Sequence, residues 1–289
     1  MKILTQWCSA SAWRSPCKRF TALCTGIVLA ALGMASTVTH AAEQEAHANG
    51  KKKANWDIVM GAGLAHLPDY EGSDDYERRG APLIDIEYRD FVFLRQSSLG
   101  ISVLKFKDVQ SNRALHAGPL LHLGRDRDEN DNPALRGLGD LDISVEAGVF
   151  TNLTLGSWQF RLTLFRDISH THDGLVAQGS VGWSFPMTPR LRASIGTSAT
   201  WTDGSYMQTY FGITPGQAAA SGLRPYQAGS GGKDITSSVR LEYALSNHWL
   251  LAGGFSFKRL LSDAANSPLV ADVGSASQIT AAAFIAYRF

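Results

Sequence analysis

The sequence predicts an all-β protein: a transmembrane antiparallel β-barrel of about twelve strands, with ten as the fallback count, preceded by a cleaved signal peptide. Three features predict it. Segments with alternating apolar and polar residues follow one another along most of the 289-residue chain. The links between these segments alternate between long and short, as they do in outer-membrane barrels. The chain also begins with a stretch typical of a secretory leader.

The first 41 residues are predicted to be the signal peptide. They contain four basic residues and no acidic one, and 21–34 is uncharged and mostly apolar. That stretch is shorter than the ~20 residues of a membrane-spanning helix and fits the apolar region of a leader. The small residues Thr39 and Ala41 place the cleavage after Ala41, with a retained membrane anchor as the alternative. We expect a flexible N-terminal tail at 42–55 and the barrel at 56–289.

Removing the leader changes the cysteine content and the charge. Cys8, Cys17 and Cys24 are the three cysteines of the chain and all lie in the leader, so disulfides and thiolate metal sites are excluded from the mature protein. Lys plus Arg falls from 27 to 23 against 26 Asp plus Glu, which moves the formal net charge from +1 to −3. No nucleic-acid partner is expected, because no basic field remains.

Twelve segments carry the strand pattern. In WQFRLTLFR, for example, every second residue from Trp158 to Leu164 is large and apolar, and polar residues separate them. This period of two is typical of a strand with one apolar and one polar face. We expect a bulge at Gly118–Pro119, because proline disturbs the ladder of a closed barrel. The third and fourth segments are short, hence the fallback count. The segments are 56–66, 82–89, 91–96, 99–106, 114–123, 141–152, 157–167, 174–186, 190–202, 234–245, 247–260 and 277–289.

The links give an independent indication. The four longest all follow odd-numbered segments, whereas the links after even-numbered segments are short. Outer-membrane barrels have short periplasmic turns and long external loops. We therefore expect the longest link, 203–233, outside the cell. The turns at 107–113, 153–156 and 187–189 and the tail at 42–55 are then expected to face the periplasm.

Aromatic residues lie near the ends of the predicted strands. Five tryptophans share the apolar face of their strands, which predicts aromatic girdles at the two membrane boundaries. These residues are Trp56, Trp158, Trp183, Trp201 and Trp249. The chain ends in AFIAYRF, which resembles the C-terminal signal of outer-membrane proteins. Ile285, Tyr287 and Phe289 would form this signal, and the barrel-assembly machinery would bind it.

Two segments contain residues that could carry chemistry. SHTHDG places Ser169, His170 and His172 close together in a predicted outer loop. Neighbours on a strand point to opposite faces, so a nucleophile–base pair between Ser169 and His170 is not expected, and a turn is the simpler interpretation. Two histidines without a third ligand do not define a metal site. The acidic loop 125–133 lacks the glycine and the terminal glutamate of a calcium loop. We predict no catalytic residue, cofactor or metal.

The longest link and the lumen complete the prediction. The aromatic side chains of Tyr206, Tyr210 and Phe211, on a glycine-rich frame, are candidate loop contacts. We expect this link to fold over or into the lumen; a contact surface for a partner is the alternative. Charged residues of both signs on the polar faces suggest interior ion pairs rather than a wide channel. They are Asp85, Glu87, Arg89, Asp142, Glu146, Arg161, Arg192, Arg240 and Glu242.

Four stretches together resemble the MipA/OmpV family of outer-membrane proteins: 68–95, which begins with PDYEGSDDYERRG, 123–150, 206–235 and 258–270. They succeed one another over essentially the whole mature chain. The resemblance implies a non-enzymatic barrel in the outer membrane of a Gram-negative bacterium. It also implies a scaffold role, because the founding member is described as binding a murein lytic transglycosylase and a murein synthase. SHTHDG departs from the family, where a simpler histidine–glycine turn is expected.

Three classes of function therefore stand side by side. A scaffold for peptidoglycan synthesis and hydrolysis is implied by the resemblance, a narrow pore or small-solute transporter is the alternative, and a barrel lipid hydrolase or an adhesin comes third. Besides the two murein enzymes, the expected partners are outer-membrane lipid, lipopolysaccharide and the barrel-assembly machinery.

Overall fold

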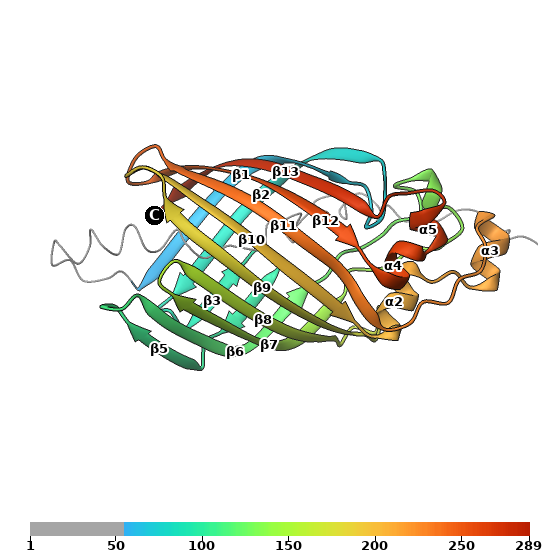
Figure 1. Ribbon diagram of the computed structural model, residues 1–289, viewed down its shortest axis with the longest axis horizontal. Helices are drawn as coiled ribbons and strands as arrows, with labels where there is room; N and C mark the ends of the chain where they lie inside the picture. The colour runs from blue at the N-terminus through green and yellow to red at the C-terminus, as the bar shows by residue number, and fades with distance from the viewer. Residues whose placement is uncertain (1–54) are drawn as a thin grey trace, which may run out of the picture.

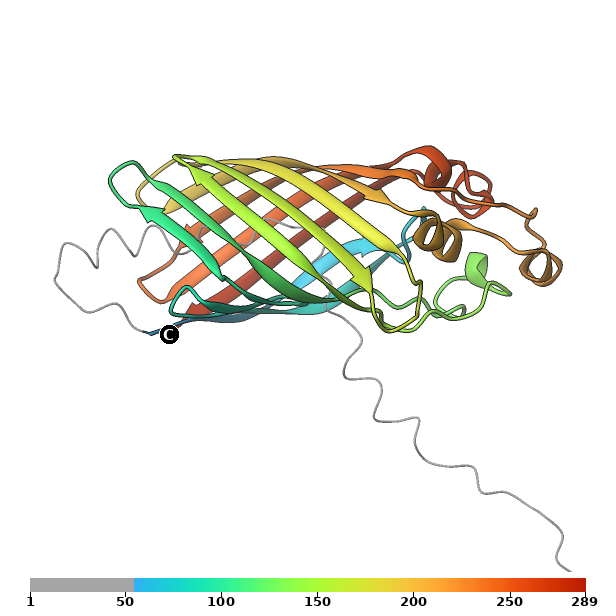
Figure 2. The ribbon, with the colours of Figure 1, turned by 90° about the horizontal axis from the view of Figure 1, so that it is seen from below.

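The computed structural model describes residues 55–289, so the predicted leader, its cleavage after Ala41 and the tail up to residue 54 lie outside the described residues. The strands form one antiparallel sheet that closes on itself (Figures 1 and 2). They are β1 (Trp56–Pro68), β2 (Tyr76–Tyr88), β3 (Val92–Arg95), β4 (Ser98–Ile101), β5 (Leu104–Asp108), β6 (Arg113–Leu123), β7 (Val145–Leu155), β8 (Trp158–Asp167), β9 (Leu175–Pro186), β10 (Leu191–Thr202), β11 (Gly231–Ala244), β12 (Trp249–Leu260) and β13 (Ser277–Arg288).

The wall contains twelve strands, as predicted. Both β4 and β5 pair with β6, so together they form one interrupted strand. The first and last strands pair from Val59↔Arg288 to His66↔Ala281, and the β4–β6 pairing completes the ring. Since every strand then has two neighbours, the predicted closed antiparallel barrel is confirmed.

The irregularity expected near Pro119 lies on the neighbouring strand. The β6–β7 register runs through Pro119↔Val149 without a shift, so β6 itself has no bulge. On the other side, β4 ends its pairing at Gly100↔Leu120 and β5 resumes it at Leu104↔Ala117. One extra residue therefore lies in the β4–β5 strand opposite Pro119, which has no N–H to donate to that neighbour.

The expectation that a strand begins at 141 is wrong. The β6–β7 ladder ends at Leu123↔Val145, and 141–144 belongs to the preceding loop. There, Leu141 and Arg127 exchange two backbone hydrogen bonds of 2.8 and 2.9 Å. Asp142 is exposed in this loop and not in the lumen. In this loop the apolar Ile143 is exposed and the polar Ser144 is buried, so the alternation of residue types there does not correspond to a strand.

The outer surface of the barrel is apolar. Large side chains such as Leu64, Leu162 and Phe255 point outward and are exposed. Inside, many hydroxyl and amide side chains line the lumen, and two small apolar clusters also lie there, one around Phe284 and one around Phe150. A closed barrel with an apolar exterior satisfies all backbone groups within the sheet and can therefore cross a membrane. Within 55–289, no helix is long and apolar enough to do so.

The long links form a cap at one end of the barrel (Figures 1 and 2). Their elements are η3 (Pro133–Leu135), α2 (Gly204–Phe211), α3 (Pro215–Ser221), α4 (Ser262–Asn266) and α5 (Pro268–Ala271). Two apolar clusters hold the links together: Met207 and Phe211 of α2 pack with Val270 of α5, while Tyr70 packs with Leu135, Leu138 and Ile213. The short turns and the C-terminus lie at the opposite end. The long link 203–233 thus folds over the mouth of the barrel, as expected, and contains two helices.

Candidate functional site

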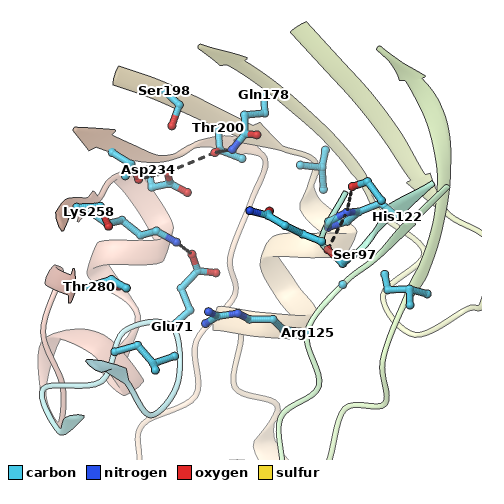
Figure 3. A pocket seen from close by; sticks show the side chains of 18 of the residues that line it. Glu71, Ser97, His122, Arg125, Gln178, Ser198, Thr200, Asp234, Lys258 and Thr280 are labelled. Atoms are coloured by element: carbon cyan, nitrogen blue, oxygen red, sulfur yellow. Dashed lines mark hydrogen bonds and ion pairs between the residues drawn. The ribbon is translucent and has the colours of Figure 1, made fainter. Parts of the chain in front are cut away.

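A cavity of about 860 Å³ lies between the cap and the lumen (Figure 3). Strands β9 to β13 form one wall of it, and they direct small polar side chains inward because inward positions recur every second residue. Loop residues from the cap close it from above. The hydroxyl and amide groups of that wall belong to Gln178, Ser180, Thr197, Ser198, Thr200, Thr236, Ser238, Ser256, Gln278 and Thr280.

Glu71 is the charged centre of the cavity. It comes from the loop after β1 and accepts hydrogen bonds from Lys233 Nζ, at 2.7 and 2.9 Å, and from Lys258 Nζ, at 2.7 Å. Lys233 also lies 3.2 Å from Asp234. Burial alone would raise the pKa of the Glu71 carboxyl, but the two ammonium groups hold it well below its usual value. Two wall strands are thereby tied to one cap loop.

A hydrogen-bonded chain continues from Asp234 along the wall. Thr200 Oγ1 lies 3.3 Å from Asp234 Oδ1 and accepts a hydrogen bond of 3.4 Å from the Gln178 amide (Figure 3). These groups can donate to and accept from a polar solute, because hydroxyls and amides have both capacities.

His172 joins the cap to the opposite wall. Its side chain is fully buried, and its Nε2 lies 3.0 Å from Glu146 Oε1. Since Nδ1 accepts from the Gly174 N–H at 3.0 Å, a ring with one proton carries it on Nε2 and donates it to the carboxylate. The ring packs edge-on against Tyr206 at 4.9 Å, and Tyr206 stacks on Tyr210 at 4.5 Å. Burial raises the pKa of the Tyr210 hydroxyl to about 12.

The SHTHDG segment is a turn built around one carboxylate. Asp167 accepts from the N–H groups of Ser169, His172 and Asp173 at 2.7–2.9 Å and from the Ser169 hydroxyl at 2.6 Å. His170 instead pairs with Asp173 at 2.6 Å and is exposed. The Ser169 hydroxyl is thus bound to Asp167 and the His170 ring to Asp173. Within 55–289, no group of three or more His, Asp or Glu side chains is placed to hold a metal ion.

The lumen contains part of the predicted ion pairs. Arg95 lies 3.2 Å from Asp85 and also pairs with Glu87, and Arg240 lies 3.5 Å from Glu242. Arg161 binds Asn152 at 2.8 Å. Arg89 was expected there but belongs to the β2–β3 turn, where its Nε donates to Asn55 at 3.0 Å. A positive φ of 52° at Arg89 ends the strand pattern there.

The predicted aromatic positions lie on the outer surface. All five girdle tryptophans are exposed, from 36% for Trp183 to 55% for Trp56. At the short-turn end, Trp158 lies 6.3 Å from Trp183, and Trp249 lies 5.2 Å from Tyr287. Their location at the membrane boundary stays a prediction.

The candidate assembly residues lie on the last strand. Ile285 is exposed, and the Tyr287 ring lies 5.0 Å from that of Phe289. The Phe289 side chain is 70% exposed, while its N–H donates to Ile58 O at 3.0 Å. Recognition of these residues by the assembly machinery stays a prediction.

The three candidate loop contacts are directed into the molecule. Tyr206 and Tyr210 line the cavity, and Phe211 is buried within the cap. The sequence did not predict that Lys233 and Lys258 bind Glu71. Each of them appears in the sequence only as a lysine on the polar face of a strand. Glu71 was visible only as part of the YEGS motif.

Comparison with known proteins identifies the family. The family model described as "MltA-interacting protein MipA" matches 60–289. Two proteins called MltA-interacting protein, from Escherichia coli K12 and Shigella flexneri, are each 25% identical over 231 residues, covering 78% of this chain and 86% of theirs. The outer-membrane channel DcaP of Acinetobacter baumannii is similar at a TM-score of 0.41, with 9% identity over 83% of this chain and 99% of that one. The chain belongs to the MipA family.

Proposed function

We propose that this protein is a non-enzymatic scaffold in the outer membrane, whose periplasmic face holds a murein lytic transglycosylase and with it a murein synthase. The observation that carries the proposal is the family match, which spans the barrel from 60 to 289 and whose relatives are called MltA-interacting protein.

The architecture supports a scaffold more than a wide channel. Helices and loops cover one end of the barrel, which we expect to face outward, and ion pairs such as Arg95–Asp85 and Arg240–Glu242 occupy the lumen. The Arg95–Asp85 pair joins β3 to β2 and the Arg240–Glu242 pair lies along β11, so charged side chains occupy the lumen and narrow it. A partner that binds murein is in the periplasm and can reach only the periplasmic end of the barrel. We therefore place the contact between the scaffold and its partner at that end.

The β5–β6 hairpin is an exposed part of that end. Every residue from Leu104 to Lys107 is exposed, and β5 pairs with a strand on one side only, β6. Lys105 and Lys107 alternate with Leu104 and Phe106. An exposed strand edge with cationic side chains suits backbone pairing and charge contacts with a partner.

The test is a binding experiment with purified proteins. The barrel is refolded in detergent, immobilised, and exposed to the soluble domain of the lytic transglycosylase from the same cells. We expect the Lys105→Glu/Lys107→Glu variant to bind about tenfold more weakly. Arg224→Glu is the matched control, because it reverses an exposed charge on the cap at the other end. Equal binding by the two variants, or none by the unaltered protein, would contradict the proposal.

A second candidate, a small-solute transporter, is favoured by the cavity beneath the cap. A transporter of this type is expected to let small solutes cross a bilayer at a measurable rate. A scaffold is expected to show no large and stable ion conductance in planar bilayers. Liposome swelling with sugars of increasing size separates the two.

A further inference from the structure

One side of β2 lacks a strand partner over most of its length. Toward β1, β2 pairs continuously from Trp56↔Tyr88 to Pro68↔Tyr76. Toward β3, it pairs only from Asp85↔Arg95 to Tyr88↔Val92. The half of β2 nearer the cap, 76–84, therefore forms an open edge at the cap end of the wall, and no described strand continues the ladder there.

Pro82 explains where the ladder stops. The last bond on this side runs from the Gln96 N–H to the Ile84 carbonyl at 3.1 Å. Alternate residues of an antiparallel strand direct their backbone groups to the same neighbour, so Pro82 and Gly80 are next in line. Proline has no N–H to offer. A Cβ atom placed on Gly80 would meet nothing within 4 Å, so a larger side chain can be introduced at this edge.

The cavity beneath the cap reaches this open edge. Its lining includes Gly80, Pro82 and Ile84, which face outward from β2, together with Leu123 and Ile143. Ile84 is 37% exposed, Leu123 42% and Ile143 41%. The same cavity is lined on its far side by lumen groups such as the Thr200 hydroxyl. An apolar opening thus connects the membrane-facing surface with a polar chamber.

The chamber offers a cation near this opening. Arg125, in the loop directly after β6, points into the cavity (Figure 3). Among residues 55–289 its guanidinium has no hydrogen-bond or ion-pair partner, in contrast to the ammonium groups of Lys233 and Lys258, which bind Glu71. Guanidinium groups bind carboxylate and phosphate oxygens well. The hydroxyls of Ser198 and Thr200 line the far side of the same cavity and add hydrogen-bonding groups to the chamber.

We propose that this opening is a lateral portal through which a membrane amphiphile places its anionic head in the chamber while its alkyl chain stays in the lipid. The apolar edge suits the chain, and the Arg125 guanidinium and the hydroxyl wall suit the head. The apolar rim would not contribute to binding a water-soluble solute, and the polar chamber would not contribute to binding a lipid that stays outside the barrel. Only an amphiphile would use both features.

The test uses a long-chain fatty acid that carries a diazirine beside its carboxylate. Wild-type protein in lipid vesicles is irradiated with the probe, and labelled residues are identified by peptide mass spectrometry. We expect label on the inward-facing Ser198 and Thr200 and on α2. In Gly80→Trp the indole fills the opening, and label at these residues is expected to fall at least tenfold. Gly179→Trp is the matched control, because Gly179 also has nothing within 4 Å of its Cβ but does not line the cavity.

Arg125→Gln provides a second arm that leaves the opening unchanged. Lumen labelling is expected to fall about tenfold in this variant too, while labelling of outward-facing residues stays the same. Circular dichroism and the heat-modifiable shift on gels establish that each variant is folded. Label confined to outward-facing residues in the wild type would overturn the portal, as would equal lumen label in the wild type, Gly80→Trp and Arg125→Gln. The first result would leave the β2 edge as a docking site for another strand.

Discussion

The Nζ atom of Lys258 lies 2.7 Å from the Oε1 atom of Glu71, which joins β12 to a loop 187 residues earlier in the chain. Lys233 of β11 binds the same carboxylate. The pairing therefore fixes a cap loop against two adjacent wall strands at once. Glu71, Lys233 and Lys258 are largely buried. Removing one of these side chains therefore leaves a charge that has lost its counter-charge and is poorly solvated.

The first prediction concerns Glu71→Gln. The amide keeps the shape but not the charge, so the ammonium groups of Lys233 and Lys258 repel each other and the loop loosens. We expect amide hydrogen exchange in α2 and α4 to become about tenfold faster. Asp74→Asn is the control, since it makes the same change at an exposed position of the same loop. Unchanged exchange in Glu71→Gln would show that apolar packing alone holds the cap.

The second prediction is the pH dependence of the same contact. The two lysines hold the pKa of Glu71 below its usual value of about 4.3. A carboxyl with a lowered folded pKa contributes stability that is present above the unfolded pKa and lost as pH falls through the folded one. Exchange in α2, corrected for its intrinsic rate, is therefore expected to be equal at pH 7 and pH 5. A steep rise between these values would contradict the assignment.

How far the sequence predicts the molecule depends on local pattern. The strands could be found because each one alternates between lipid and lumen along its own length, as in 158–166. The cap could not, because its helices have three to eight residues and fill too little of the 11–18-residue window in which helical periodicity shows. The site is harder still, since Glu71 and Lys258 meet only when the barrel closes. His170 and His172 differ by two positions, yet only the latter is buried.

The third prediction compares these two histidines. His172→Ala removes one of the two hydrogen-bond partners of the buried Glu146 carboxylate, the other being the Ser144 hydroxyl at 3.2 Å, and it leaves the Gly174 N–H without its acceptor. We expect it to lower the free energy of unfolding by about 2 kcal/mol, the usual cost of an unsatisfied buried polar group. His170→Asn is the control, because His170 is exposed and asparagine tolerates its positive φ of 63°. Urea unfolding in lipid vesicles measures both. Equal stability of the two variants would show that His172 does not stabilise the cap.

The fourth prediction fixes the orientation in the membrane. An epitope inserted after Gly222, which is exposed at the end of α3, is expected to bind antibody on intact cells. The same epitope after Gly156, in the β7–β8 turn at the opposite end, is expected to bind only after the outer membrane is permeabilised. Long loops outside and short turns inside give this order. The reverse result would move the cap, its cavity and the portal to the periplasmic side.

The last prediction concerns the end of the chain. The Phe289 side chain faces outward, while its N–H donates to Ile58 O, so the final residue takes part in joining β13 to β1. Replacing Tyr287 and Phe289 together by serine removes both outward aromatic side chains but leaves every backbone bond available. If the terminal aromatics act as an assembly signal, the double variant is expected to accumulate in the periplasm or be degraded. Outer-membrane fractionation and heat-modifiability on gels measure this.

The matched control is the double variant Phe255→Ser/Phe257→Ser. These two aromatic side chains also face outward, from the adjacent strand β12, and are 46% and 43% exposed. The control loses comparable apolar surface to lipid, so a general loss of membrane affinity would reduce both variants alike. A specific signal at the terminus would reduce the Tyr287/Phe289 variant at least tenfold and the control far less. Equal amounts of folded barrel from the two would mean that β13 matters for closure of the sheet and not for recognition.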